Sequence, residues 1–84
     1  MTDFAQTNSA DIAFAITPSD STLIPETRGV YVGVGGNVVA LMLNSAGAYA
    51  AVTFSNVPSG AILPIRCTRI NSTSTTATNM VALY

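Results

Sequence analysis

The stretch Arg28–Ser55, RGVYVGVGGNVVALMLNSAGAYAAVTFS, decides the fold class of this 84-residue chain. In its first part Val30, Val32 and Val34 fall on one face of an extended segment, with Tyr31 on the other, as in a β-strand. Further β-rich segments follow, separated by short clusters of turn residues. The turn clusters are Gly35–Asn37 and Asn44–Gly47, and the β-rich segments are Val38–Leu43 and Ala50–Ser55. We expect residues 35–37 to close a hairpin between the strands on either side.

The same pattern continues outside this stretch. Ile12, Phe14 and Ile16 alternate with alanines, which predicts a strand with one face on the core. Two more predicted strands are Ala61–Ile70 and Asn79–Tyr84. Pro64 indicates an edge position or a bulge in the first of these, and the many Thr, Val and Gly residues disfavour helices. The sequence therefore predicts an all-β fold, a small antiparallel β-sandwich or barrel of about six to seven strands.

The chain divides into an N-terminal arm, residues 1–10, and a single β domain, residues 11–84. The arm is polar except for Phe4, and we expect it either to be flexible or to dock through Phe4 on a neighbour. A domain of this size is only marginally stable. One cysteine and no histidine leave it without an internal disulfide or the commonest metal ligand. Association with partner subunits is the remaining way to stabilise it.

Charge is scarce. Charged residues make up 8% of the chain, against about 25% in an ordinary soluble domain, and residues 29–65 carry none. Such a surface predicts self-association. Three arginines without a lysine exclude the basic surface of a nucleic-acid-binding protein, and no apolar run approaches the ~20 residues of a membrane span. No secretory signal is visible, and a single free cysteine is typical of a protein made in a reducing cytoplasm.

No motif predicts catalysis, a metal or a cofactor. Residues 33–36 lack the third glycine and the following helix of a phosphate-binding loop. The carboxylates of Asp11, Asp20 and Glu26 have the spacing of no known metal loop, and Asp20 is expected to serve a local turn. Cys67 has no histidine to activate it, so we expect a buried apolar cysteine. The protein is predicted not to be an enzyme.

Contact residues are the remaining candidates. Arg66 and Arg69 are either solvated or pair with Asp20 or Glu26 of a neighbouring subunit, since oligomer interfaces favour arginine. The hydroxyl-rich loop 72–78 is either a solvated, mobile connection, a lateral contact or a carbohydrate-binding tip. The candidate interface residues are Phe4, Arg66, Arg69 and Tyr84.

Three segments show a resemblance to a known family. They are ITPSDST (Ile16–Thr22), RGVYVGVGGNVV (Arg28–Val39) and VTFSNVPSGAILPIRCTRINSTSTTATNMVALY (Val52–Tyr84). In this order they resemble the head-spike base proteins of tailed phages and gene transfer agents. The closing block, with VPSG, ILPIR and TTAT before VALY, is the most specific part, whereas residues 40–51 and the arm match little.

The resemblance implies a small β-rich virion protein without catalytic residues or cofactors, located on the outer surface of the capsid. In the gene transfer agent, this family forms the base of a head spike at the fivefold vertices and holds a distal fibre-like protein. We therefore expect a homo-oligomer, from trimer to hexamer, whose partners are the major capsid protein and a distal spike or fibre protein. The alternative is a receptor- or carbohydrate-contacting module of a tail or baseplate, with exposed aromatic residues among Tyr31, Tyr49 and Tyr84.

Overall fold

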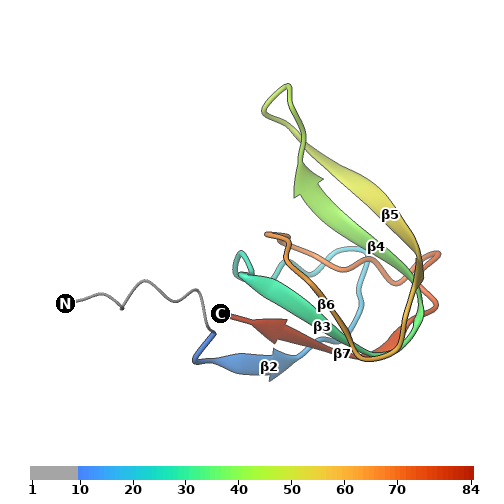
Figure 1. Cartoon of the computed structure of the whole chain (residues 1–84). Helices are drawn as coiled ribbons and strands as arrows, with labels where there is room; N and C mark the ends of the chain where they lie inside the picture. Colours follow the sequence, from blue (N-terminus) through green and yellow to red (C-terminus); the bar gives the residue numbers. More distant parts are fainter. Residues whose placement is uncertain (1–9) are drawn as a thin grey trace.

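The computed structural model describes residues 10–84, which form an all-β fold without a helix (Figure 1). Its strands are β2 (Ala13–Ala15), β3 (Gly29–Val34), β4 (Gly36–Leu43), β5 (Tyr49–Val57), β6 (Ala61–Leu63) and β7 (Thr78–Leu83). They make two antiparallel sheets, one of four strands in the order β2-β7-β3-β6 and one formed by the β4–β5 hairpin. The predicted fold class is confirmed. The predicted arm lies, except for Ala10, outside the described residues.

The four-stranded sheet is organised around its two central strands, β3 and β7. Val30 lies opposite Ala82, and Val32 lies opposite Met80. All four side chains are buried, with 0–2% of their surface exposed. Because side chains alternate along a strand, this inward row places Gly29 and Tyr31 of β3, and Val81 and Leu83 of β7, on the outer face of the sheet.

The second sheet is extended by a segment that precedes the last loop. Leu41 N donates to Arg69 O at 2.8 Å, and Asn71 N donates to Val39 O at 2.8 Å. Ala40 and Ile70 form an isolated antiparallel bridge between the same segments. Residues 69–71 therefore lie along β4 on the side away from β5.

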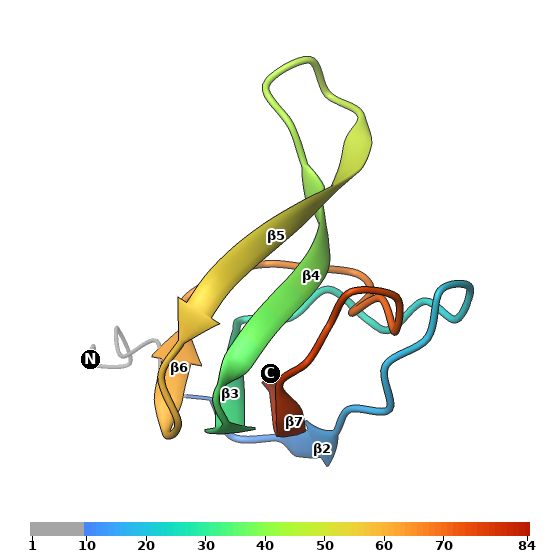
Figure 2. The ribbon, with the colours of Figure 1, turned by 90° about the vertical axis from the view of Figure 1, so that its right-hand side faces the viewer.

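The core lies between the two sheets and combines residues from both. Its buried cluster is Val30, Val32, Val38, Ala40, Val57, Cys67, Ile70, Ala77 and Met80. Cys67 is fully buried, as the sequence predicts. Figure 2 shows the distal half of the β4–β5 hairpin rising away from the rest of the protein.

The predicted hairpin at residues 35–37 is wrong. β3 pairs with β6 and β7, whereas β4 pairs with β5, so Gly35 marks the corner where the chain passes from one sheet to the other. A Cβ at Gly35 would lie 2.3 Å from Val57 O, and Gly35 N donates to Ser59 Oγ at 2.8 Å. Glycine is required here because a second corner, between β5 and β6, crosses in direct contact with the first.

Two further expectations need correction. β6 ends at Leu63, directly before Pro64, instead of continuing to Ile70, although it is an edge strand as Pro64 indicates. β2 is the opposite edge strand, and Ile12 and Phe14 are 52% and 63% exposed. The alternating pattern at β2 thus marks a strand correctly, but of its three large apolar residues it is Ile16 that packs against the core, because β2 lies at the edge of its sheet.

Candidate functional site

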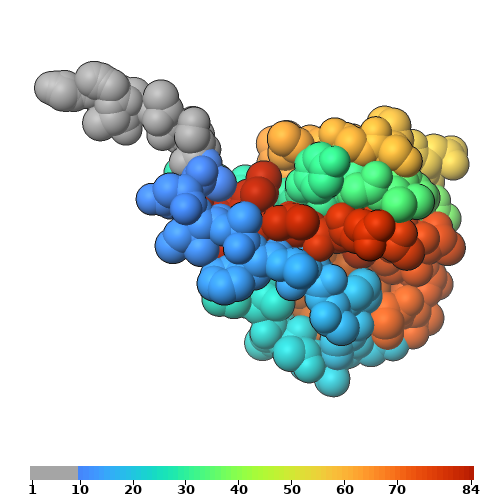
Figure 3. Space-filling model, turned by 90° about the horizontal axis from the view of Figure 1, so that it is seen from below, coloured from blue at the N-terminus to red at the C-terminus, as the bar shows by residue number. Residues whose placement is uncertain are grey.

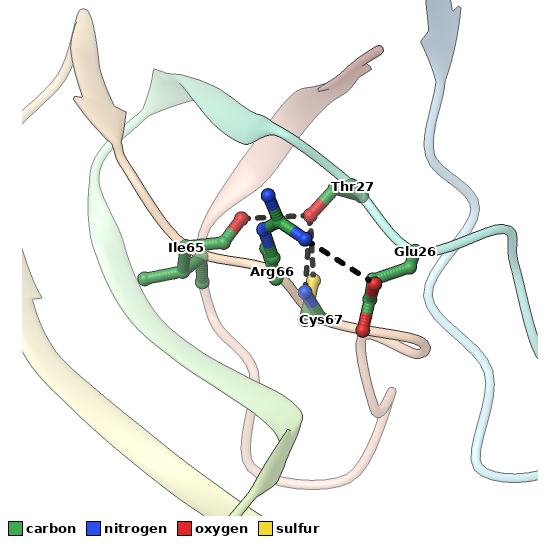
Figure 4. Close-up of polar contacts among 5 residues, drawn as sticks. All are labelled: Glu26, Thr27, Ile65, Arg66 and Cys67. Atoms are coloured by element: carbon green, nitrogen blue, oxygen red, sulfur yellow. Dashed lines mark hydrogen bonds and ion pairs between the residues drawn. The ribbon is translucent and has the colours of Figure 1, made fainter.

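Thr27 is the buried polar residue of the core and connects the start of β3 to the segment that follows β6 (Figure 4). Its Oγ1 donates to Ile65 O at 2.8 Å and accepts a hydrogen bond from Cys67 N at 3.1 Å. The backbone adds a third link, from Thr27 N to Cys67 O at 3.1 Å. Residues 65–67 are thereby held against residue 27, which leaves the intervening Arg66 side chain pointing outward.

An open hollow of about 240 Å³ lies beside this threonine and is lined by Glu26, Thr27, Arg28, Arg66 and Tyr84. Arg66 Nη1 lies 3.8 Å from Glu26 Oε1, and the Arg66 side chain is 77% exposed. A guanidinium this exposed has donors to spare for a carboxylate or a carbonyl of a second molecule. The hollow therefore has the chemistry of a polar contact site.

Tyr84 is fixed at one side of this hollow. Its hydroxyl donates to Pro25 O at 3.2 Å, and its ring meets that of Phe14 edge to face at 6.0 Å. Burial raises the pKa of the Tyr84 phenol, which keeps the hydroxyl a donor. The structure thus brings two predicted interface residues, Arg66 and Tyr84, into one site.

Arg69, a third predicted interface residue, is not part of it. Arg69 is half-buried, and its Nε donates to Asn71 Oδ1 at 2.7 Å. Phe4 lies outside the described residues. Sequence analysis did not single out Thr27 or Arg28, although two polar residues directly before a strand of valines were a signal for a site at its end.

Asp20 has a different role from the local turn expected of it. Its carboxylate accepts hydrogen bonds from Ser72 N and Thr73 N, both at 3.0 Å, and from the Thr73 hydroxyl. These bonds, the Thr73 side chain foremost, lower the pKa of Asp20. The turn itself is made by Ser19, whose Oγ accepts hydrogen bonds from the backbone amides of Ser21 and Thr22.

The hydroxyl-rich loop 72–78 is therefore anchored to the protein. Besides the contacts to Asp20, Thr75 Oγ1 accepts from Val39 N at 3.0 Å and Thr76 Oγ1 accepts from Asn37 N at 2.8 Å. These hydroxyls support the edge of β4, so the loop is largely exposed, as expected, but is tied to the protein at Thr73, Thr75 and Thr76.

The remaining chemical groups of residues 10–84 are dispersed. No three His, Cys, Asp or Glu side chains in this range gather as a metal site would require. Burial raises the pKa of the Cys67 thiol, opposite to what a nucleophilic cysteine needs. In the same range, no helix has the length and apolarity that crossing a membrane demands.

The fold and site together define a class of small all-β protein, in which the hydrogen-bonded polar side chains of residues 10–84 hold local structure. No family model matches the chain, and no curated protein matches it. Among solved structures, it is similar to a chain from the capsid of a native gene transfer agent particle computed with C5 symmetry. The two are 34% identical, with a TM-score of 0.76, and the match covers 100% of this chain and 92% of that chain. This chain belongs to the same family and is a capsid-related protein of the phage and gene transfer agent type.

Proposed function

We propose that this protein is a non-enzymatic structural component of a virion that decorates the outer surface of the capsid as the base of a head spike. The similarity over the full chain to a protein of a C5-symmetric gene transfer agent capsid carries this proposal. The order and specificity of the three segments 16–22, 28–39 and 52–84, which resemble head-spike base proteins, support the head-spike assignment. On this proposal the chain forms a ring at the vertex, contacts the major capsid protein, and holds a distal spike or fibre protein.

The hollow around Arg66 and Tyr84 is the proposed polar contact of this assembly. Arg66 is solvent-exposed and only loosely held by Glu26, so a partner carboxylate replaces solvent at little structural cost. Arg69 and Phe4 remain proposed interface residues on sequence grounds, Arg69 close to the hydroxyl-rich loop and Phe4 in the arm.

Binding to capsid particles made without this protein tests the proposal. The purified chain should cosediment with such particles saturably, and electron microscopy of the saturated particles should show it at the fivefold vertices. Arg66→Gln should weaken binding about tenfold, as expected for loss of an interfacial charged hydrogen bond. The matched control is Asp11→Asn, which changes one exposed charge outside the hollow.

The outcomes separately test capsid decoration, the vertex position and the role of the hollow. Binding spread over the whole capsid surface would contradict the vertex position and indicate a general cement protein. Absence of binding at any concentration would contradict a capsid-decorating function. Equal binding by Arg66→Gln and Asp11→Asn would remove the hollow from the interface.

A further inference from the structure

We propose that the distal part of the β4–β5 hairpin of one copy, residues 41–52, packs on the outer face of the four-stranded sheet of the next copy. This inference rests on the proposed function and names the contact that builds the ring. The distal part of the hairpin extends beyond the body of the protein (Figures 1 and 2). Two-stranded ribbons are marginally stable in water on their own, so the part of the hairpin beyond the pairing of β4 with residues 69–71 would be stabilised by a partner surface.

The side chains of the hairpin show that both of its faces need covering. Leu43 and Tyr49 lie directly opposite each other and are 57% and 54% exposed. Val52, three positions from Tyr49 and thus on the other face, is 41% exposed. Residues 41–52 contain no charged side chain. Apolar side chains exposed on both faces of a protruding, uncharged ribbon are typical of a segment buried in an assembly.

The same chain carries a second uncovered apolar surface. Strand pairing places Ala15, Val81, Tyr31 and Ile62 in one row across the sheet. This row faces away from the core, because the neighbouring row, with Val30 and Ala82, is buried. Ala13, Leu83 and Gly29 form the next outward row. Figure 3 shows this outer face, where β2, β7, β3 and β6 lie side by side and no other segment of residues 10–84 covers them.

The two surfaces match in their lack of charge and in the sizes of their side chains. Neither contains an ionised side chain, so their contact buries no charge that would need a partner. The outer face has small residues over β2 and larger ones, Tyr31 and Ile62, over β3 and β6. The exposed alanines of β2, Ala13 and Ala15, leave room for the large side chains of the ribbon, Leu43 and Tyr49. A specific interface takes about 800 Å² from each partner, about a sixth of the 4940 Å² accessible surface of the chain.

The placement of the two surfaces makes a second copy of this chain the occupant. The hairpin points away from the outer face of its own sheet (Figure 1), so it cannot cover that face itself. One copy can donate its hairpin and accept another at the same time. Such a heterologous contact repeats from copy to copy and closes into a ring when the rotation between copies allows it.

Two double variants test this contact. Leu43→Thr with Tyr49→Thr removes the apolar surface of the hairpin, and Tyr31→Thr with Ile62→Thr removes that of the outer face. Threonine retains the preference for strands. Leu23→Thr is the matched control, because this leucine is 62% exposed and belongs to neither surface. The mass in solution is measured for each by light scattering on a sizing column.

The wild type and the Leu23→Thr control should form a closed oligomer. Each double variant should be monomeric, with contact affinity reduced about 100-fold or more, as expected when two central apolar side chains are lost. A 1:1 mixture of the two variants should give complexes of two chains, because an intact hairpin then meets an intact outer face once. Circular dichroism and thermal unfolding check that the variants are folded, and a variant that fails is replaced by Tyr49→Thr or Ile62→Thr alone.

Three results would overturn the inference: a monomeric wild type, a double variant that assembles like the control, or a mixture that stays monomeric. Assembly of either double variant on its own would indicate hairpin-to-hairpin or face-to-face contacts. Cosedimentation with capsid particles separates this inference from the proposed function. A wild type that binds particles but is monomeric refutes only the contact, whereas a ring that binds no particle refutes the capsid role.

Discussion

Replacing Thr27 by valine should destabilise this protein by about 2 kcal/mol, although the two side chains have the same shape. The substitution leaves the Cys67 amide without an acceptor and Ile65 O without a donor, at a site that is 2% exposed. Each unsatisfied buried group costs about 1–3 kcal/mol, and the cost at Ile65 is at the low end because that bond is only partly buried. The added methyl group returns about 0.8 kcal/mol. The net loss of about 2 kcal/mol corresponds to a decrease of about 8–16 °C in Tm.

Thr27→Ser provides the comparison that separates hydrogen bonding from packing. Serine keeps both hydrogen bonds and loses one buried methyl group, at a cost of about 1 kcal/mol. Hydrogen bonding therefore predicts that the serine variant is more stable than the valine variant, whereas packing alone predicts the reverse. Thermal unfolding followed by circular dichroism measures the order, at equal protein concentration because association shifts Tm. A valine variant as stable as the serine variant would refute the role assigned to Thr27.

Three other substitutions or conditions test the fold. Gly35→Ala should prevent the two corners from crossing, because its Cβ would lie 2.3 Å from Val57 O, and should abolish soluble folded protein on expression. Asp20→Asn should be less stable than the wild type at neutral pH. The folded pKa of Asp20 is lowered by Thr73, so its contribution is present above the unfolded pKa of about 3.9 and is lost as the pH falls through the folded pKa. Acid titrations of Tm should show the two proteins converging, and parallel curves would contradict this. Cys67, fully buried and with its thiol pKa raised by burial, should react with a thiol reagent only as fast as the protein opens, so its labelling rate should rise with denaturant.

Local patterning predicted the strands but not all of their partners. The alternation of valines in β3 and the turn at Asn44–Gly47 depend on neighbouring residues, and both were predictable. Whether Gly35 closes a hairpin or turns a corner depends on Ser59 and Val57, which lie more than 20 residues away. Glycine tolerates both conformations, so its identity alone cannot decide between them.

At the site, too, the local sequence indicates candidate residues but not their distant partners. An exposed arginine in an almost uncharged chain was a sound candidate, and Arg66 does line the hollow. Its pairing with Glu26 of the same chain depends on Thr27 holding residues 65–67 in place. Asp20 likewise binds amides 52 and 53 positions away, a pairing that nothing in the local sequence signals.

The low charge content of the chain follows from the way its loops are held. Backbone amides at the corners and loop edges need acceptors, and here neutral side chains supply them: Ser59 for Gly35, Thr76 for Asn37, and Asn44 for the amides of its own turn. Ionised residues are thus not needed to hold most of these loops. An interface that buries such a surface avoids the desolvation cost that buried charges impose. The composition therefore suits the fold and the proposed contact at once, since hydroxyl and amide side chains complete the fold and the proposed hairpin-to-sheet contact buries no charge.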